Sequence, residues 1–572
     1  MMNKLTKLST IMIAVLGINT ALANTVNYRI EVVAAPEEFK NNFPVDINNK
    51  NEVASVLTYR FNHPIDVDLL DFDEQDFSLA ATLANFGEDN VSYLESVRRG
   101  RFSATSLGIV LSYLTDGSIR SDGQHQQIAS IRTAFSDENE STELAIIDKI
   151  NNNTDEFYYN NNEHVRAIND LSWLTGDTQP FLQETRIDGE NWLIPNYIHR
   201  GFVKTSNSVI ELTPPYDEVL GGFSYATDVS NEGYIVGYGS VGDTFALQNL
   251  VASCENNNDE TPEEICYWRF LNGSLANQTS YFRSHALMWK VNSNGEITET
   301  IDLGMAIDDS ELPSQARYDS KAYSVNNLGL AVGETDVLNI NNSVRTQAAL
   351  FYQDNVQVLT NPNSTLFSRA VKINDNNIVV GTVSDSAGLS AVIKSFYYDV
   401  NSNAVDVTIL DDFFVSAETK VRDINNSNQI VGVTEVEGLS SGAKPKHGFI
   451  YDLDTEKMLD LNSLLSCESD FRIVDAVAIN DDGVILAHAS LTQNARDRMG
   501  DFIGEDSNGD PITEQVEYTV KLIPDAEGQV ACQAPAGETG IKRKGAAMNA
   551  WLLFSFFITF LFKNIFSNRK LV

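Results

Sequence analysis

Three side chains with oxygen atoms alternate in the sequence DSNGDPITE at positions 506–514 and could bind a metal ion. Asp506, Asn508 and Asp510 have the alternate spacing of a calcium-binding loop. Calcium prefers carboxylate and carbonyl oxygens, so it is the one cofactor that the sequence suggests. Pro511, however, stands where an EF-hand needs glycine. An ordinary Asn/Gly turn is therefore the alternative interpretation.

Motifs that carry catalytic chemistry are scarce. GYGSVG at 237–242 has the GxGxxG spacing of a dinucleotide-binding loop, but it lies in a repeated hairpin without a βαβ unit, so we treat it as coincidence. HExxH and Walker sequences are absent. Catalytic residues therefore stay unknown, and an enzyme is less favoured than a protein that only binds.

The chain has four cysteines, and they fall into two pairs along the sequence. Cys254 and Cys266 enclose a short acidic segment, whereas Cys467 and Cys532 bracket the last repeat. Of the three ways to pair four cysteines, only pairing of neighbours closes two local loops, and we expect two such disulfides in an exported chain. A zinc site is disfavoured because none of the four lies in a CxxC pair or beside a histidine.

The composition is strongly acidic, with 79 Asp and Glu against 40 Lys and Arg and a formal net charge of −39. Such a surface repels phosphate backbones, which argues against nucleic-acid binding. It favours solubility, divalent cations or basic partners. A surface that is simply well solvated is the alternative interpretation.

One short phrase recurs along the chain: an aliphatic residue, Asn or Ser, a few turn formers, then two or three aliphatics and often Gly. DINNSNQIVG is the clearest copy and contains Asn425 and Gly432. The copies begin at Asp46, Ala167, Asp228, Ser324, Lys372, Asp423 and Ala478. The last three intervals are 48, 51 and 55 residues, which indicates an array of similar supersecondary units.

Each phrase predicts a β-hairpin, because Asn, Asp and Gly tolerate left-handed backbone angles and β-branched residues flank them. A second hairpin follows in most units, at 201–212, 286–304, 349–360, 395–410 and 448–461. Four short antiparallel strands with a period of about 40 to 50 residues are typical of a β-propeller blade. The sequence therefore predicts an all-β propeller of six or seven four-stranded blades.

The half-motif INxxxxIVG followed by a His-Ala-Phe variant resembles the HAF-type extracellular repeat of exported bacterial proteins. His285-Ala286-Leu287 and His447-Gly448-Phe449 carry this resemblance, and 199–202 is a shifted version. Together with both chain ends, the protein resembles a family of exported proteins of unassigned function. The resemblance implies a propeller-like fold and no activity. Because His285 and His447 recur with the repeat, we expect them to be structural.

Two further features concern segments outside the clear copies of the repeat. The segments 26–36 and 516–525 share alternating aliphatics and a proline, so we expect them to lie in one blade and join the two ends. The segment 71–163 does not follow the repeat and predicts an insertion. Its parts 124–135 and 141–152 have helical spacing. A lid or recognition element over one face is one interpretation, and a solvated loop with two packing helices is the other.

The two chain ends have the composition of targeting segments. Residues 1–23 have lysines, a short apolar run and a small-residue ALA, as in a signal peptide. Residues 545–563 are uncharged and apolar between basic clusters, which predicts a transmembrane anchor or sorting helix. The propeller would occupy 24–530, with a linker at 531–544 and a basic tail at 564–572. We therefore expect an exported protein that is membrane-anchored through this helix, faces the periplasm or cell surface, and is retained there or released by C-terminal processing.

Three classes of function fit these features. The first is a binding or interaction module at the cell envelope for a protein or glycan partner. The second is a carbohydrate-active hydrolase or lyase at one face of the propeller, which would require carboxylates that converge near the channel. The third is a structural surface component.

Overall fold

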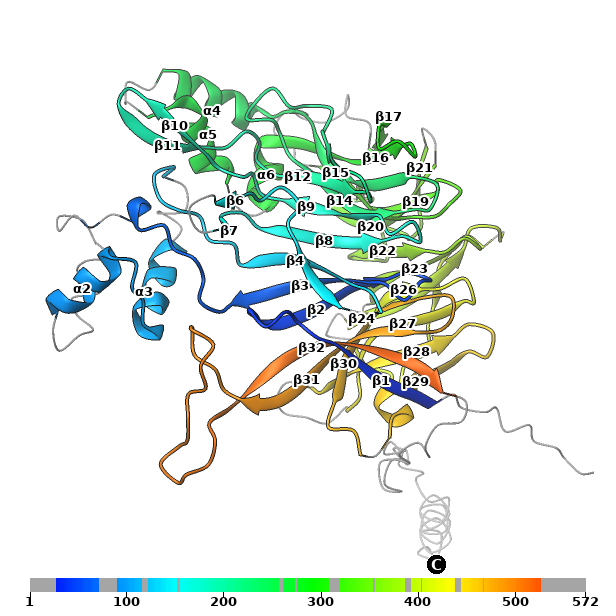
Figure 1. The fold of residues 1–572 in the computed structure, drawn as a ribbon. Helices are drawn as coiled ribbons and strands as arrows, with labels where there is room; N and C mark the ends of the chain where they lie inside the picture. Colours follow the sequence, from blue (N-terminus) through cyan, green and yellow to red (C-terminus); the bar gives the residue numbers. More distant parts are fainter. Residues whose placement is uncertain are drawn as a thin grey trace, which may run out of the picture.

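The computed structural model describes residues 27–525, except for 71, 73–89, 116–121, 139, 152–154, 257–260, 273–274, 308–317, 353–354, 386–391, 403, 438–443 and 467. Seven four-stranded antiparallel sheets surround a common axis, as a β-propeller (Figure 1). The predicted all-β propeller with four-stranded blades is confirmed, and the number of blades is seven. In each of blades 1 to 6 the four strands follow one another from the axis outward.

The strands of each blade are given from the axis outward. Blade 1 has β2 (Phe39–Ile47), β3 (Val53–Arg60), β4 (Ile131–Ser136) and β5 (Ser141–Leu144), and blade 2 has β8 (Glu163–Ile168), β9 (Leu174–Thr178), β12 (Arg200–Lys204) and β13 (Val209–Leu212). Blade 3 has β14 (Ser224–Val229), β15 (Tyr234–Asp243), β16 (Phe282–Val291) and β17 (Ile297–Gly304), and blade 4 has β18 (Ser320–Val325), β19 (Ala331–Leu338), β20 (Val344–Tyr352) and β21 (Asn355–Val358). Blade 5 has β22 (Ser368–Ile373), β23 (Ile378–Asp385), β24 (Val392–Asp399) and β25 (Thr408–Ile409), and blade 6 has β26 (Thr419–Ile424), β27 (Gln429–Glu435), β28 (Lys446–Asp452) and β29 (Lys457–Asp460). Blade 7 has β30 (Arg472–Ile479), β31 (Ile485–Asn494), β32 (Thr513–Asp525) and β1 (Asn27–Val33).

The recurring phrase forms the turn between the first and second strand of every blade. Its fourth turn residue has a positive φ in all seven copies, as the richness in Asn and Gly predicts. These residues are Asn51, Ser172, Gly233, Gly329, Asn377, Asn428 and Gly483. The first Asn of the phrase fixes the turn from within: the Asn425 side-chain oxygen accepts hydrogen bonds from the backbone N–H groups of Ser427 and Gln429.

A β-bulge interrupts the innermost strand of every blade just before this turn. One residue is skipped where the first strand pairs with the second, for example between Val421 and Asp423. The bulge brings backbone close to the second strand, so that a Cβ atom at Gly432 would lie 2.2 Å from the Lys420 carbonyl oxygen. Glycine occupies this position in blades 2 to 6, whereas blades 1 and 7 have Ser55 and Ala487, so the bulge rather than the turn favours glycine here.

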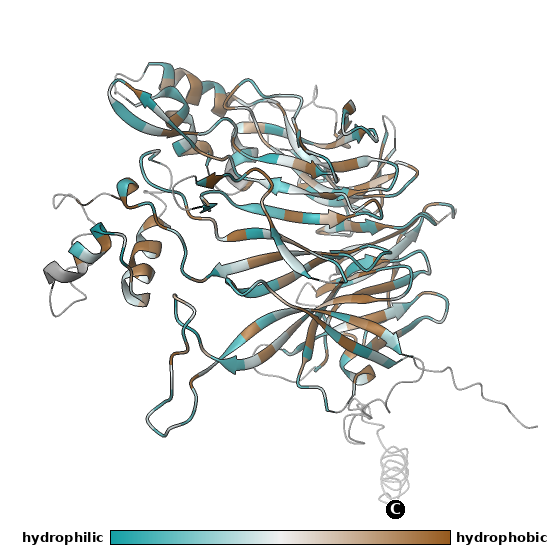
Figure 2. Cartoon of the chain, viewed as in Figure 1, coloured by the Kyte–Doolittle hydropathy of each residue, from teal (hydrophilic) through white to brown (hydrophobic). Residues whose placement is uncertain are grey.

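Apolar side chains fill every seam between neighbouring blades. Seven buried clusters each combine residues of two adjacent blades, for example Val332 and Leu350 of blade 4 with Ala370 and Val379 of blade 5. Figure 2 shows hydrophobic residues along the stacked strands and hydrophilic residues on many of the turns. The core of this protein is therefore a set of seams between blades.

The two ends of the described chain meet in blade 7. Strand β1 pairs antiparallel with β32 over seven residues, from Asn27 with Asp525 to Val33 with Thr519. The prediction that 26–36 and 516–525 share one blade is confirmed. The five predicted second hairpins are also present, as the third and fourth strands of blades 2 to 6.

The prediction of helices at 124–135 and 141–152 is wrong. The first segment contains most of β4, which pairs with β3, and the second begins with β5, so part of the expected insertion completes blade 1. In the first segment the charged residue Arg132 is only 1% exposed on β4, although the sequence pattern treats a charged residue as exposed. Its guanidinium forms ion pairs with Glu143, Asp148 and Glu163. The helices of this region lie between β3 and β4 instead: η1 (Val67–Leu69), α2 (Asn90–Arg98) and α3 (Ala104–Leu114).

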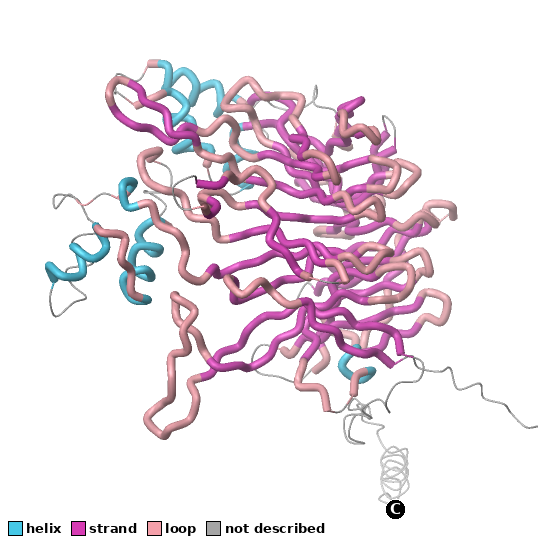
Figure 3. Tube along the Cα trace, viewed as in Figure 1, coloured by secondary structure: helices cyan, strands magenta, loops and turns pink. Residues whose placement is uncertain are grey.

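All large insertions connect the second and third strands of a blade. Blade 1 contributes α2 and α3, and blade 7 contributes the long connection from β31 to β32. Blade 2 contributes β10 (Gln183–Ile187) and β11 (Glu190–Ile194), and blade 3 contributes α4 (Phe245–Glu255), α5 (Glu263–Leu271) and α6 (Leu275–Tyr281). Because the strands alternate in direction, these insertions share one face, on the left in Figures 1 and 3, and the recurring turns share the opposite face. Three short elements, β6 (Ile150–Asn151), β7 (Glu156–Phe157) and η4 (Leu461–Leu464), complete the fold.

The expected signal peptide, transmembrane or sorting helix and basic tail lie outside the described residues. Within the described part of the chain, no helix is long and apolar enough to cross a membrane.

We expect Gly432→Ala to lower the free energy of unfolding by about 1 to 3 kcal/mol, because the added methyl group would overlap the Lys420 carbonyl oxygen. The matched control is Ala487→Gly, since Ala487 occupies the equivalent position of blade 7 and pairs with Ala476. Denaturant unfolding measures both variants. Equal stability of the Gly432→Ala variant and the unchanged protein would contradict the role of the bulge.

Candidate functional site

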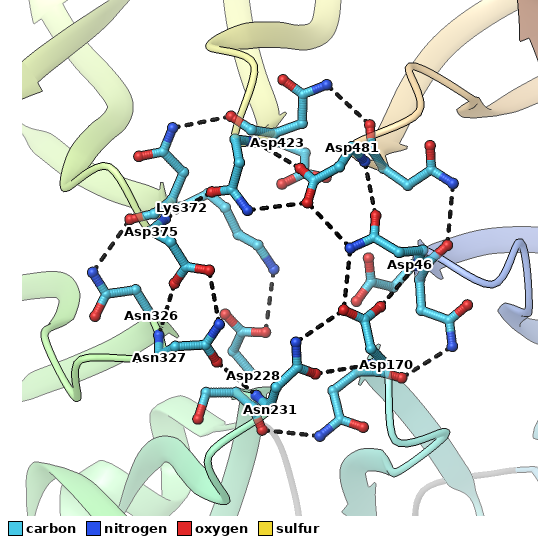
Figure 4. A pocket seen from close by; sticks show the side chains of 18 of the residues that line it. Asp46, Asp170, Asp228, Asn231, Asn326, Asn327, Lys372, Asp375, Asp423 and Asp481 are labelled. Atoms are coloured by element: carbon cyan, nitrogen blue, oxygen red, sulfur yellow. Dashed lines mark hydrogen bonds and ion pairs between the residues drawn. The ribbon is translucent and has the colours of Figure 1, made fainter.

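The recurring turns converge around the propeller axis and enclose an open cavity of about 150 Å³ (Figure 4). We call this cavity the ring pocket. It is lined by the residues before, at and after the first Asn of the phrase, from all seven blades. The local sequence places them there because the β-bulge and the left-handed turn end every innermost strand in the same way.

An inner ring of carboxamides joins the blades at the pocket wall. In six of the seven seams, the first Asn of one phrase donates a hydrogen bond from Nδ2 to the carbonyl oxygen of the equivalent residue in the next blade. The bonds run from Asn48 to Asn169, Asn169 to Ser230, Asn326 to Asn374, Asn374 to Asn425, Asn425 to Asn480 and Asn480 to Asn48, at 2.9 to 3.2 Å. Blade 3 has Ser230 at this position, so its seam with blade 4 lacks the bond.

An outer ring at the pocket mouth closes over all seven blades. The second residue of each phrase donates its backbone N–H to the side-chain oxygen of the equivalent residue in the next blade, at 2.8 to 2.9 Å. The ring consists of Asn49, Asp170, Asn231, Asn327, Asp375, Asn426 and Asp481. Three of these seven side chains are carboxylates, so the mouth of the pocket is acidic.

Three more carboxylates lie deeper, at the second-to-last residue of the innermost strands. Asp46, Asp228 and Asp423 each accept a backbone N–H from their own blade and one from the next blade. The bonds to the next blade reach Ile168, Val325 and Ile479 at 2.8 to 3.1 Å. Each of these aspartates therefore holds a seam and carries charge at the axis.

Lys372 is the one cation among the residues that line the ring pocket. Its Nζ atom lies 3.2 Å from the Asp228 carboxylate. Burial opposes the charge of Lys372, but Asp228, Asp46 and Asp423 together raise its pKa above the ordinary value. One ammonium thus faces three carboxylates, and the charges of the pocket do not balance.

Burial, together with the neighbouring charges, changes the acidity of the pocket. Burial raises the pKa of Asp46 to about 7, with Lys372 opposing and Asp423 and Asp228 adding to the rise. Burial also raises the pKa of Asp423, again against Lys372. The pocket therefore takes up a proton near neutral pH. Across the described residues, no three His, Cys, Asp or Glu side chains lie close enough to share a metal ion.

The four residues that the repeat pattern singled out as structural lie at recurring positions of the blades. Asn425 belongs to the inner ring and Gly432 faces the bulge. His285 and His447 lie on the third strands of their blades, and each binds an aspartate at the end of the fourth strand. The Nδ1 atoms lie 2.9 Å from Asp302 and 2.8 Å from Asp460. These pairs link two strands of one blade, away from the ring pocket.

The metal and disulfide predictions concern other parts of the chain. Asp506, Asn508 and Asp510 form an exposed turn in which the Asp506 carboxylate accepts the backbone N–H groups of the other two. These hydrogen bonds lower the pKa of Asp506. The carboxylate thus stabilises its own turn, and calcium binding there stays a prediction.

Cys254 of α4 and Cys266 of α5 form a disulfide. Cys467 and Cys532 lie outside the described residues, so their pairing stays a prediction.

Sequence reasoning did not identify the charged residues of the ring pocket. Asp46, Asp228, Lys372 and Asp423 all begin a copy of the phrase, immediately before its recurring aliphatic position. A charged residue near the end of a strand that is expected to be buried is the signal that could have identified these residues. A second motif was also missed: GLSSG at 438–442 has the GxSxG spacing of a nucleophile elbow. It connects β27 with β28, two paired strands, and its residues lie outside the described part of the chain.

These features define the protein as a seven-bladed β-propeller closed by its own N-terminal strand. Residues 5–559 match the model of a family described as protein of unknown function (DUF3466), and the chain belongs to this family. The match does not test the likeness to the HAF-type repeat. A search among curated proteins finds no match.

Several solved structures are similar to this chain. The β-propeller domain of the Trilobed protease from Pyrococcus furiosus aligns at 9% identity and a TM-score of 0.35, over 86% of this chain and 100% of that domain. The Pyrococcus horikoshii acylaminoacyl peptidase aligns at 9% identity and 0.37, over 81% and 53% of the two chains. The NanB sialidase from Streptococcus pneumoniae aligns at 9% identity and 0.29, over 87% and 70%.

We expect Ser230→Asn to raise the free energy of unfolding by about 0.5 to 1.5 kcal/mol, because the new carboxamide would reach the Asn326 carbonyl and complete the inner ring. The reciprocal control, Asn326→Ser, removes the bond to Asn374 and should lower stability. Denaturant unfolding compares the two. A loss of stability in both variants would show that blade 3 does not accept the arrangement of the other six.

The raised pKa of Asp46 makes stability depend on pH. Because the folded protein holds this proton more tightly than the unfolded chain, the Asp46 contribution is present below about pH 4 and is lost as the pH rises through about 7. Relative to an Asp46→Asn variant, the unchanged protein should lose about 3 kcal/mol between about pH 5 and about pH 8. Denaturant unfolding at several pH values measures the difference.

The control for this pH series is Asp454→Asn, which removes an exposed carboxylate from the turn between β28 and β29. It should leave the pH dependence unchanged. If Asp46→Asn and Asp454→Asn behave alike, Asp46 does not titrate near neutral pH.

Proposed function

We propose that this protein is a non-enzymatic binding module whose ring pocket receives a cationic group, an ammonium or a guanidinium, of a protein partner. The observation that carries the proposal is the imbalance of charge at the axis. Asp46, Asp228 and Asp423 face a single internal cation, Lys372, beneath a mouth that bears three further carboxylates. A positively charged hydrogen-bond donor would offset this excess.

The rigidity of the pocket supports recognition. Both rings fix their side chains between adjacent blades, so that a ligand does not need to order them on binding. A preorganised site loses less conformational entropy when it binds, which favours affinity. The cavity of about 150 Å³ suits the head group of one side chain rather than a large ligand.

A carbohydrate-active enzyme is the competing proposal, since three carboxylates meet at the axis. Every oxygen of Asp46, Asp228 and Asp423 already accepts a backbone N–H, and each carboxylate holds two blades together. A nucleophile or general base must bond to the substrate or to its proton, which would disturb these seam contacts, whereas a cationic donor can share the remaining lone pairs of the same oxygens. The hydrogen bonding therefore favours binding over hydrolysis.

The proposed place of action is the cell envelope. The leader at 1–23 and the apolar segment at 545–563 are the basis for an exported protein at the cell envelope, anchored there or released. Strand β32 ends at Asp525, next to the recurring turns, so the described part of the chain ends on the face of the ring pocket. Partners of a tethered protein would have to reach the ring pocket on that side.

We expect n-butylammonium to bind the full-length protein in calorimetry and neutral n-butanol not to bind. Because Asp46 is ionised mainly above about pH 7, affinity at about pH 6 should be roughly tenfold weaker than at about pH 8. Asp170→Asn, Asp375→Asn and Asp481→Asn, combined in one variant, should weaken binding by a similar factor. Asn occupies the same ring position in four other blades, so this variant removes charge and keeps the ring.

Asp454→Asn serves as the matched control, because it removes one exposed charge away from the axis. Binding of n-butanol as tight as that of n-butylammonium, or an affinity unchanged by the triple variant, would refute the proposal. Hydrolysis of a glycan that depends on Asp46 or Asp423 would establish the enzyme instead.

A further inference from the structure

A second polar cluster lies mainly on the first and second strands of the blades, farther from the recurring turns than the ring pocket. We call it the arginine wall. It spans blades 2 to 5 and consists of Arg166, Asp177, His199, Tyr225, Tyr238, Lys321, Tyr323, Glu334 and Arg369. Both faces of each blade are covered by its neighbours, so an exposed side chain on an innermost strand can reach solvent only at the channel or at its ends.

Arg166 and Arg369 are held in the same way at the two ends of the wall. The Nε atom of Arg166 donates to Asp177 at 2.7 Å, and the Nε atom of Arg369 donates to Glu334 at 2.7 Å. The two carboxylate side chains are 6% and 4% exposed, whereas the two arginine side chains are 40% and 41% exposed. Within the described part of the chain, the terminal nitrogens of both guanidinium groups have no hydrogen-bond partner.

A continuous row of contacts connects the two arginines. His199 binds Asp177 at 2.8 Å and stacks on Tyr225 at 4.2 Å, and Tyr225 stacks on Tyr238 at 5.0 Å. On the other side, Lys321 lies 5.9 Å from the Tyr238 ring and 3.3 Å from Glu334.

The row is fixed from two directions. Tyr225 donates to Gln278 of α6, which ties the wall to the face that carries the insertions. The Tyr323 hydroxyl donates to Glu334 at 2.8 Å. Packing and hydrogen bonds therefore fix the wall before any ligand binds.

The two anchoring carboxylates stay ionised. Burial alone would raise the pKa of Asp177, but Arg166 and His199 hold it below the ordinary value. Burial acts in the same direction on Glu334, and Arg369 and Lys321 likewise hold its pKa below the ordinary value. Both guanidinium groups thus keep their anchors at neutral pH.

We propose that the arginine wall binds carboxylate groups, carried by an acidic sugar or an acidic amino acid, at the guanidinium groups of Arg166 and Arg369. The proposal is independent of the ring pocket and of its cationic ligand. A guanidinium anchored through Nε presents its two terminal nitrogens as donors toward solvent, and a carboxylate accepts two parallel hydrogen bonds from such a group.

The charges of the wall are balanced, so the net charge of the wall does not select the ligand. Lys321 also pairs with Asp319 at 3.4 Å, so the three cations of the wall are matched by its two carboxylates and that of Asp319. In a chain with a net charge of −39, long-range attraction does not bring an anion here. Selection depends on the donor geometry of the two guanidinium groups at short range.

Arg422 of blade 6 offers a natural comparison. It also lies on an innermost strand, its side chain is 45% exposed, and it pairs with a carboxylate of the next blade. Its Nε and NH2 atoms both bind Asp475, at 3.1 and 2.7 Å. One terminal nitrogen of Arg422 is therefore already used, and Arg422 should not bind a carboxylate in the same way.

The test is calorimetry of D-glucuronate, N-acetyl-glutamate and D-glucose with the full-length protein at about 150 mM salt, which screens long-range charge. At least one of the two acids should bind about tenfold more tightly than D-glucose. Tighter binding of glucuronate would identify an acidic sugar as the source of the carboxylate, and tighter binding of N-acetyl-glutamate an acidic peptide. Equal binding of glucose and both acids, or no binding of either acid, would overturn the proposal.

Arg166→Lys and Arg369→Lys should each weaken binding of the tighter acid by about tenfold, because lysine keeps the ion pair with the buried carboxylate but lacks the paired donors. Arg422→Lys is the matched control and should bind within about twofold of the unchanged protein. Thermal unfolding of the three variants separates binding from stability. If all three lose binding equally, or if neither wall variant loses any, the arginine wall is a structural ion-pair network only.

Discussion

The pairing of β1 with β32 is the contact on which the rest of the structure depends. Seven residues of the N-terminal strand complete the sheet of blade 7, so that both ends of the described chain are held in one blade. A separate blade exposes two faces, and only a closed ring covers both faces of every blade. The buried cluster between blades 7 and 1 contains Val33 of β1 together with Val53 and Leu486, which ties closure to core packing.

The ring pocket follows from the way the seams are closed. At three seams, the backbone N–H of the next blade would lack an acceptor, and Asp46, Asp228 and Asp423 supply it. At another seam, the uncharged hydroxyl of Ser324 accepts the backbone N–H of Ile373 in the same way. The acidity at the axis is therefore partly a consequence of satisfying buried backbone groups, and Lys372 offsets only part of it.

The two faces of the propeller differ in construction. The face of the recurring turns is nearly symmetric, because one phrase builds all seven turns. The opposite face is asymmetric, since blades 7, 1, 2 and 3 carry the large insertions (Figure 1). Those insertions also contact one another: the Leu193 N–H donates to the Gly123 carbonyl, and Trp268 of α5 packs against Leu182 and Leu193. The arginine wall lies between these two faces and joins the insertions through Gln278.

Local physics made the blades predictable from the sequence. Left-handed backbone angles select Asn and Gly, as at Asn428 and Gly483, and alternation of aliphatic residues marks the strands on either side. These signals act over a few residues, so they gave the hairpins and the period. The strand pattern shared by 26–36 and 516–525 even revealed the closing blade. Helical spacing failed at 124–135, where Arg132 is buried on β4 and pairs with three carboxylates, contacts that a local pattern does not indicate.

The sequence by itself determined the repeated hairpin, the type of fold and the acidic character of the chain. Only the tertiary structure decided that Asp46, Asp228, Lys372 and Asp423 share one axis, although 377 residues separate the first from the last. The same holds for Arg166 and Arg369, which lie on different blades of one wall. The physical reason is that closure of the ring sets which blades face each other across the channel, and closure depends on all seven seams together.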